Sequence, residues 1–293
     1  MNNCEMRLLP GDEQKMILPL LGKCFPDYWE QIALKTGKMP FEEISFAAFD
    51  GNSPVAHCGI IPYEMYCNGQ IFKMAGIASV ATDPNYRKQG IARNLCELAT
   101  SWAAKNGFAS LPLYTAFFRV YEAAGWHQLE IPATLAARVS APSFAWRSGN
   151  QLTMEEQQEI VKLYAGSEIF DGKVLRKNSG TLHSWQRIFQ DVEFQFAVIP
   201  GAYAIRSGGV VIECGFDVEM TAAERENFFA GLHTDGIVTF LLPPTADNTE
   251  VVSTLKCETS SQDAMHGERP MVLDIIPDFH RQNQIFFPVT DKF

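Results

Sequence analysis

The stretch VATDPNYRKQGIARNL, residues 80–95, has the pattern of a strand, a sharp turn and the start of a helix. The turn carries Arg87, Lys88, Gly90 and Arg93, although the whole chain has a formal net charge of −10. The first amides of a helix have no partner within the helix, and the helix dipole adds partial positive charge at the same point. A glycine there lets a ligand approach the backbone closely. The stretch therefore predicts an anion site suited to a pyrophosphate.

The segments around this turn predict alternating hairpins and helices. Two turn signals, Asp50-Gly51-Asn52 and Asn68-Gly69, divide residues 46–84 into three or four strands. A helix is expected over residues 90–106, followed by a strand at 110–115 and a short helix that ends at Gly125. Residues 12–36 predict two short helices, because Pro19 and Pro26 interrupt the helical pattern.

The second half of the chain repeats this alternation. The composition shifts around residues 140–150, which predicts a domain boundary there. Two capping-box patterns, Thr153 with Glu156 and Thr221 with Glu224, predict helix starts. Strand-like runs lie between and after them. We expect an α+β fold of two domains, residues 1–140 and 150–293, each a mostly antiparallel mixed sheet flanked by helices.

Composition narrows the classes of function. The chain has 293 residues, 46% of them hydrophobic and 20% charged, a balance typical of globular proteins. The negative net charge argues against a nucleic-acid partner. No apolar run reaches the roughly 18 residues of a membrane span, and the first residues lack the apolar core of a secretory signal. Seven cysteines without metal-type spacing predict free thiols, no bound metal and a cytoplasmic location. The six histidines form no catalytic motif and are interpreted as ordinary surface or core residues.

The stretch ASVATDPNYRKQGIARNLCELATSWAAKNG, residues 78–107, resembles the acetyl-CoA-binding motif of the GNAT acetyltransferase superfamily. LYTAFFRVYEAAGW, residues 113–126, is similar to the strand and helix that follow in that superfamily. The resemblance covers about residues 5 to 135. It departs from the usual pattern at Thr115, where many relatives carry Asn or Ser, and at Ala92, which replaces a second glycine.

The resemblance implies a set of site residues. The amides from Lys88 to Arg93 would hold the pyrophosphate of acetyl-CoA, and the backbone from Val80 to Thr82 would bind the pantetheine arm. Tyr121 would act as general acid toward the departing thiolate; a phenol with an ordinary pKa of about 10 is protonated at neutral pH and can do so. The cofactor-binding prediction therefore comprises Val80, Ala81, Thr82, Arg87, Lys88, Gln89, Gly90, Ile91, Ala92 and Arg93.

The whole chain resembles the enhanced-intracellular-survival (Eis) type of acetyltransferase, without the sterol-carrier-like third domain of that type. Its second half would be a degenerate GNAT-like domain that binds no cofactor. Asp217, Glu219 and Glu224 lie at the strand-to-helix crossing of that half, where carboxylates would repel a pyrophosphate. In that family the terminal carboxylate serves as general base, which here would be Phe293.

The acceptor side is less determined by the sequence. Phe25, Tyr28 and Trp29 are expected to line an acceptor pocket, and Glu64, Glu42 and Glu43 stay open as alternative bases. We predict an acetyl-CoA-dependent N-acetyltransferase whose acceptor is a small-molecule or peptide amine, attacking the thioester directly. The alternatives are a non-catalytic acyl-CoA-binding sensor or scaffold and a tRNA-dependent aminoacyl transferase. The oligomeric state stays open, with a homo-oligomer compatible because relatives with two such domains often assemble.

Overall fold

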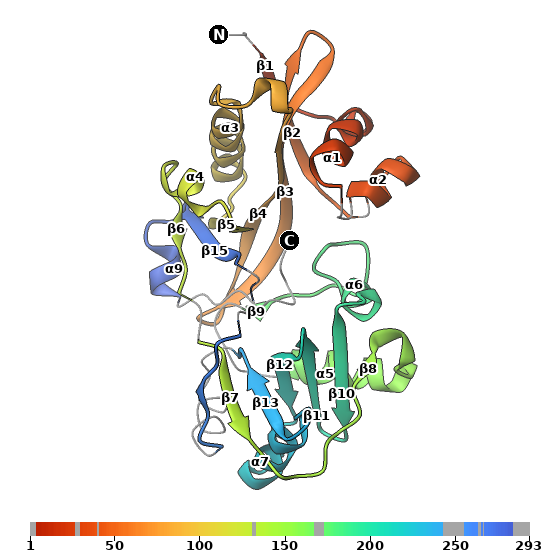
Figure 1. Cartoon of the computed structure of the whole chain (residues 1–293). Helices are drawn as coiled ribbons and strands as arrows, with labels where there is room; N and C mark the ends of the chain where they lie inside the picture. Colours follow the sequence, from red (N-terminus) through yellow and green to blue (C-terminus); the bar gives the residue numbers. More distant parts are fainter. Residues whose placement is uncertain are drawn as a thin grey trace.

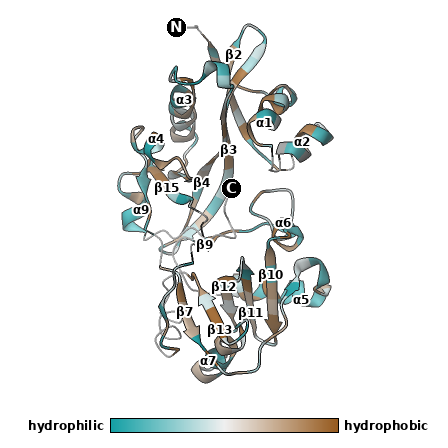
Figure 2. Cartoon of the chain, in the orientation of Figure 1, coloured by the Kyte–Doolittle hydropathy of each residue, from teal (hydrophilic) through white to brown (hydrophobic). Residues whose placement is uncertain are grey.

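The protein folds around two mixed β-sheets that lie end to end, each with helices packed beside it (Figure 1). The structure is a computed structural model that describes residues 4–26, 30–39, 41–130, 133–166, 173–242, 255–262, 265 and 267–283. The strands of both sheets are mainly hydrophobic, whereas the helices carry both hydrophobic and hydrophilic residues (Figure 2). The predicted α+β fold, with a mostly antiparallel mixed sheet in each half, is confirmed.

The first sheet contains the strands that the two turn signals of the first half predict. Its neighbouring strands are antiparallel, except that β4 and β5 run parallel. Their order is β1 (Glu5–Leu8), β2 (Ile44–Asp50), β3 (Ser53–Cys67), β4 (Gln70–Thr82), β5 (Ser110–Thr115), β15 (Arg269–Asp274) and β6 (His127–Gln128), and β9 (Lys173–Val174) pairs with β3.

Helices cover both faces of this sheet (Figure 1). On one face α3 (Ile91–Lys105) buries Leu95 and Ala99 against Phe46 and Ile60 of the sheet. On the other face lie α1 (Leu18–Cys24) and α2 (Glu30–Thr36), preceded by the short 3-10 helix η1 (Gln14–Ile17). The two short helices expected in residues 12–36 are therefore present. Pro19 sits in the first turn of α1, where a missing amide hydrogen costs nothing. A second 3-10 helix, η2 (Pro84–Tyr86), and the short helix α4 (Phe118–Glu122) complete this half.

The second sheet repeats the plan of the first. Its strand order is β14 (Glu258–Thr259), β7 (Leu135–Arg138), β13 (Ile237–Phe240), β12 (Val210–Phe216), β11 (Ala202–Ser207), β10 (Phe194–Ile199) and β8 (Arg147–Ser148). The helices of this half are η3 (Gly149–Gln151), α5 (Met154–Gly166), α6 (Trp185–Gln190) and α7 (Ala222–Gly231). The short helix α9 (Phe279–Gln282) follows β15 and lies beside the first sheet (Figure 1). The run β10-β11-β12-α7-β13 reproduces β2-β3-β4-α3-β5, and β12 and β13 are again parallel. Both predicted capping boxes form.

Among the described residues, three strands lie in the sheet of the other half of the chain, and one of them is β9, which pairs with β3 of the first sheet. β7 comes from the first half and lies between β13 and β14 of the second sheet, whereas β15 comes from the second half and lies between β5 and β6 of the first sheet. The expected division into residues 1–140 and 150–293 stays a prediction, with β7, β9 and β15 each pairing in the sheet of the other half. Hydrophobic periodicity identifies a strand but does not specify the sheet that it joins.

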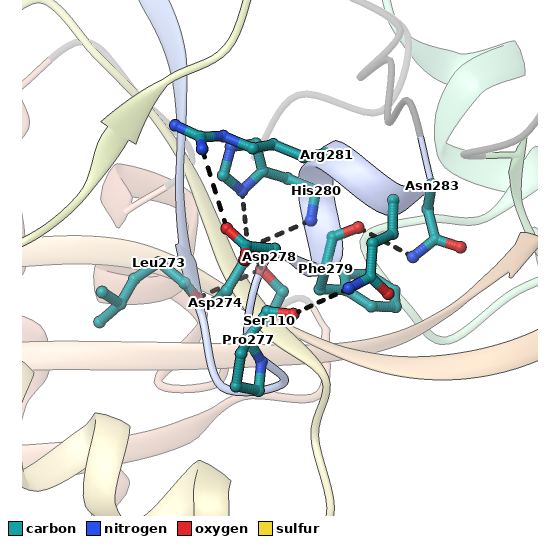
Figure 3. A network of polar contacts seen from close by, with 10 residues as sticks. Ser110, Leu273, Asp274, Pro277, Asp278, Phe279, His280, Arg281 and Asn283 are labelled. Carbon is teal, nitrogen blue, oxygen red and sulfur yellow. Dashed lines mark hydrogen bonds and ion pairs between the residues drawn. The ribbon is translucent and has the colours of Figure 1, made fainter.

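Polar contacts fasten the exchanged strand β15 to the first sheet (Figure 3). The Asp274 carboxylate accepts hydrogen bonds from Ser110 on β5 and from the Nδ1 and main-chain amide of His280 on α9. Beyond α9, Asn283 contacts Asn68 in the β3–β4 turn at 2.9 Å. The end of the described chain is therefore tied to the first half.

Candidate active site

Strand β4 has an open edge on the side of β5. Among the described residues, β4 pairs with β5 at Met74 and Ser110 alone, and β3 lies along its other edge. From Ala75 to Thr82 this edge is not paired with a strand in the part of the chain that the structure describes. The two parallel strands therefore separate toward their carboxyl ends. Main-chain amides and carbonyls on such an edge are free to bind an extended ligand.

A bulge in β4 decides which main-chain groups face this edge. Cys58 on β3 lies opposite both Ser79 and Val80, because Gly59 pairs with Ala78 and His57 pairs with Ala81. Ser79 has a φ of 51°, a left-handed conformation that is uncommon for a residue with a side chain. An extra residue reverses the alternation of the strand after the bulge.

Hydrogen bonds on either side of the bulge show this reversal. The carbonyl of Lys73 faces β5, where it accepts from the amide of Ala109, whereas the amide of Asp83 faces β3 and donates to Val55. Residues 73 and 83 would face the same edge in an unbroken strand. By the same alternation, the main-chain groups of Val80 and Thr82 face the open edge.

The turn between β4 and α3 presents uncapped amides. Lys88 and Gly90 have φ values of 62° and 79°, and Gly90 is the N-cap residue of α3 without a side-chain cap. Alternation of left-handed residues with ordinary ones turns successive amides to one side, which makes an anion-binding concavity. A Cβ placed on Gly90 would meet no atom within 4 Å, so the space in front of the helix is open. All four residues from Arg87 to Gly90 are exposed.

The basic side chains of the turn differ in their contacts. The guanidinium of Arg87 donates to the carbonyl of Thr82 at 3.1 Å, so it lies beside the open edge of β4. Arg93 instead forms an i,i+4 ion pair with Glu97 at 2.9 Å along the outside of α3. Ile91 buries its side chain in the core, which leaves only its backbone for a ligand. Ala81 also buries its side chain, and its main chain faces β3, where it pairs with His57, so this predicted cofactor-binding residue does not face the open edge. The structure thus brings the other predicted cofactor-binding residues together around one turn and one strand edge.

Tyr121 lies on α4, which follows β5, at the same end of the parallel pair as the bulge. Tyr121 and Val80 pack against the same cluster of buried side chains. The rings of Tyr121 and Trp126 form an edge-to-face contact with 5.8 Å between their centroids. Among the described residues the Tyr121 hydroxyl has no hydrogen-bond partner. Burial, followed by the nearby Cys96 and Cys58, raises the pKa of Tyr121 far above its ordinary value of 10. The phenol is therefore protonated over the whole physiological range and has a proton to donate.

The acceptor side is described in part. Phe25 follows α1 and packs, half-buried, with Leu21 and Phe49 on the face of the first sheet opposite α3. The other predicted acceptor and base residues, Tyr28, Trp29 and Phe293, lie outside the described residues.

The three glutamates that were considered as alternative general bases differ in burial. Glu42 and Glu64 are exposed. Glu43 is buried, with its carboxylate accepting from Ser45 at 2.7 Å and lying 3.2 Å from His57 Nε2. The sequence predicts an ordinary surface or core histidine at His57 and does not predict its contact with Glu43. The signal available in sequence was a histidine within the apolar run VAHCGII of β3.

The corresponding crossing in the second half, between β12 and α7, has a different chemistry. Thr221 caps α7, and the Glu224 carboxylate bonds back to the Thr221 amide, so the helix start satisfies its own donors. The hydrogen bonds from Thr221 hold the pKa of Glu224 below its usual value, so the carboxylate is ionised. Asp217 and Glu219 precede the same helix. An anion would meet negative charge and occupied amides there.

Two further properties concern the described residues alone. None of the helices in the described ranges is long and apolar enough to cross a membrane. Nor do these ranges contain a cluster of three His, Cys, Asp or Glu side chains arranged to hold a metal ion.

Residues 5–129 match the family model described as an acetyltransferase (GNAT) domain. The part of the chain that builds most of the first sheet is therefore similar to GNAT acetyltransferase domains. No match was found among curated proteins.

Solved structures extend the similarity of fold over both sheets. GCN5-related N-acetyltransferases from Kribbella flavida and Anabaena variabilis are each 17% identical, with TM-scores of 0.61 and 0.64. The alignments cover 93% of this chain and 72% and 73% of theirs. Eis1 from Mycobacterium abscessus is 10% identical with a TM-score of 0.61, over 93% of this chain and 73% of that chain. The resemblance to the two-domain type holds for the fold of the chain.

Proposed function

We propose that the protein is an acetyl-CoA-dependent N-acetyltransferase whose active site lies where β4, α3 and α4 meet. The observation that carries this proposal is the uncapped start of α3, reached through left-handed Lys88 and Gly90, beside the open edge of β4. Pyrophosphate binding at a helix start and strand-like binding of an extended arm require these two features side by side.

The cofactor would be held mainly by the backbone. The amides from Lys88 to Arg93 are available to the pyrophosphate, with Arg87 adding positive charge at the edge of the turn. Val80 and Thr82 turn main-chain groups toward the gap between β4 and β5, where the pantetheine arm would lie as an additional strand. Ala92, half-buried on the first turn of α3, is small enough to leave the approach open.

The reaction would proceed by direct attack of an amine on the thioester carbonyl. Acetyl-CoA supplies the acetyl group as a thioester. The amine nitrogen, having lost a proton to a base or to water, forms the new bond to the carbonyl carbon, and the bond from that carbon to sulfur breaks. A main-chain amide at the β4 bulge would stabilise the developing negative charge on the carbonyl oxygen. Tyr121 would donate its proton to the sulfur.

We further propose that the first half alone holds the cofactor. The capping box of Thr221 and Glu224 occupies the helix start that α3 leaves open, and the neighbouring carboxylates repel anions. The second half would then be a GNAT-like unit that shapes the molecule without binding acetyl-CoA.

A thiol-release assay tests this function. The protein would be mixed with acetyl-CoA and a panel of small and peptide amines, and the released thiol would be titrated. Turnover that depends on both the amine and the protein is the expected result. Tight binding of CoA without thiol release toward any amine would contradict the proposal and favour an acyl-CoA sensor. Activity that requires tRNA would instead indicate an aminoacyl transferase.

A further inference from the structure

A buried pair of titratable side chains, Glu43 and His57, lies behind the β4 bulge and has no part in the chemistry described above. Both side chains are 0% exposed. His57 lies on β3 between Ala47 of β2 and Ala81 of β4, two small residues that leave room for the imidazole on the face opposite α3. Charged groups are rarely buried so completely unless they are paired.

His57 is directed at the bulge itself. Its Nδ1 lies 2.8 Å from the carbonyl oxygen of Ser79. A carbonyl oxygen accepts and never donates, so Nδ1 carries a hydrogen. The imidazole thus holds the main chain of the residue whose φ of 51° makes the bulge.

Glu43 completes the arrangement on the other side of the ring. Its Oε1 lies 3.2 Å from Nε2 in an ion-pair contact and accepts the hydroxyl of Ser45 at 2.7 Å. The contact is an approach of two buried polar groups and not a hydrogen bond, because Nε2 of His57 and Oε2 of Glu43 have no hydrogen-bond partner among the described residues.

Gly59 provides the space for this contact. A Cβ at this position would lie 2.5 Å from the Glu43 carboxylate. Gly59 pairs with Ser45 on β2 and with Ala78 on β4, directly before the bulge. His57 makes the contact with Ser79, Glu43 lies against the other side of its ring, and Gly59 leaves the space that Glu43 needs.

We propose that Glu43 and His57 are positioning residues for acetyl transfer. They would fix the main chain at Ser79 and Val80 so that the amide at the bulge meets the thioester carbonyl. This inference rests on the proposed function, because the bulge matters for catalysis only when an acyl group lies against it. The pair acts through the backbone and touches no substrate.

The role predicts an effect on turnover rather than on cofactor binding. The pyrophosphate site at residues 88–93 lies beyond the bulge and is unaffected by His57, whereas small displacements of catalytic groups cost about 10²-fold in rate. His57→Leu removes the donor to Ser79. We expect it to lower kcat by about 10²-fold while the KM for acetyl-CoA changes by less than about threefold.

Matched variants separate positioning from general loss of structure. His57→Asn keeps an N–H donor near the place of Nδ1 and should restore kcat to within about tenfold of the parent protein. Gly59→Ala drives the Glu43 carboxylate from the ring and should reproduce the His57→Leu defect without changing His57. If His57→Leu does not fold, Gly59→Ala and His57→Asn carry the test.

A double-mutant cycle with Ser79 tests the connection to the bulge. Glycine adopts positive φ without a Cβ penalty, so Ser79→Gly reduces the need for an external hold on that residue. The fractional loss of kcat caused by His57→Leu should therefore be smaller in the Ser79→Gly background. Equal losses in both backgrounds, or a parent-like kcat in folded His57→Leu, would overturn the proposal.

The protonation state of His57 gives a readout that is independent of enzyme activity. Nitrogen-15 NMR of the labelled parent protein at pH 8 should show His57 protonated at Nδ1, which is the minor tautomer of free histidine. An unprotonated Nδ1 would refute the contact with Ser79 even if the protein is an active enzyme. A protonated Nδ1 together with no turnover toward any amine would refute the proposed function and leave the contact standing.

Discussion

Ser110, the first residue of β5, donates a hydrogen bond of 3.0 Å to Asp274, the last residue of β15, across 164 positions of sequence. Asp274 also accepts Nδ1 of His280 at 2.6 Å and the His280 amide at 3.1 Å. One carboxylate therefore joins the first sheet to a strand and a helix from the far end of the chain. The exchange of β7 and β15 makes each sheet depend on both halves.

Asp274→Ala should destabilise the whole protein. The Ser110 side chain would lose a partner in a fully buried position, and His280 would lose two contacts. Leaving buried donors unsatisfied costs about 1–3 kcal/mol, so we expect a loss of about 2 kcal/mol in urea unfolding. Asp278→Asn is the matched control, because the Asp278 side chain is 66% exposed and its carboxylate has, among the described residues, a single ion-pair partner, Arg281 at 3.9 Å. Equal stabilities of the two variants would show that Asp274 does not fasten β15.

Gly90→Val combined with Arg87→Glu should abolish binding of CoA. A branched side chain would enter the open space before α3, and the new carboxylate would repel the pyrophosphate. Saturating CoA at a hundredfold excess over Kd stabilises a protein by about 2.7 kcal/mol, and this thermal shift should disappear. Gly107→Val with Lys105→Glu is the control at the other end of α3, where Gly107 has a similar φ of 75° and equally open surroundings. Retained CoA binding in the Gly90 variant would place the cofactor elsewhere.

The sequence predicts the local features of this site well. The helix start at Gly90, the strand at residues 110–115 and both capping boxes follow from residues within a few positions of each other. Such signals act through the nearest turn of backbone, so a single sequence contains them in full.

The features that the sequence did not reveal depend on distant residues. The exchange of β7 and β15 is a choice between two sheets that offer similar apolar edges. The bulge at Ser79 is a matter of register between β3 and β4, and a serine at positive φ has no compositional signature. His57 meets Glu43 because β2 and β3 pair with a particular register, and alternation alone could not distinguish this contact from ordinary burial.

Tyr121→Phe should lower turnover with little effect on CoA binding. Burial raises the pKa of this phenol, and its hydroxyl has no hydrogen-bond partner among the described residues, so its removal leaves no other group unsatisfied. Loss of a general acid typically costs about 10²-fold in kcat. Tyr66→Phe, an exposed tyrosine on β3, is the control and should keep the parent kcat. An unchanged kcat in Tyr121→Phe would assign proton donation to water or to another group.

Glu213→Gln should unfold the second half more readily. Glu213 on β12 receives two hydrogen bonds from Arg176, at 2.9 and 2.5 Å, and one from the Tyr203 hydroxyl at 2.8 Å. The Arg176 side chain is 0% exposed and stacks on the ring of Tyr164, so its charge cannot reach water when the carboxylate is removed. Breaking such a buried pair costs about 3–5 kcal/mol in chemical denaturation.

The double variant Arg176→Met with Glu213→Leu separates charge from packing in this pair. Apolar residues of similar volume remove both buried charges together, so the double variant should be more stable than Glu213→Gln alone. If it is less stable, the hydrogen bonds between the two side chains, rather than the buried charge of Arg176, account for the loss.

The stability of the second half should also depend on pH through Glu156. Hydrogen bonds from Arg147, and then from the Thr153 backbone, hold the pKa of Glu156 below its usual 4.5. The folded state therefore favours the ionised form, so this contribution is fully present above pH 4.5 and is lost as the pH falls through the lowered pKa. Glu156→Gln keeps the capping bond to Thr153 but not the charge. Because the pair is partly exposed, we expect a Tm difference of about 2 °C at pH 7 that shrinks progressively as the pH falls below 4.5.

Glu159→Gln on the same helix is the matched control for this pH dependence. Among the described residues the Glu159 carboxylate has one ion-pair partner, Lys162 at 3.6 Å, whose side chain is 69% exposed. Its variant should follow the Tm of the parent at every pH to within about 1 °C, since exposed pairs on a helix contribute little. A constant Tm difference between the parent and Glu156→Gln from pH 7 to pH 3 would mean that Arg147 stabilises α5 by packing rather than by charge.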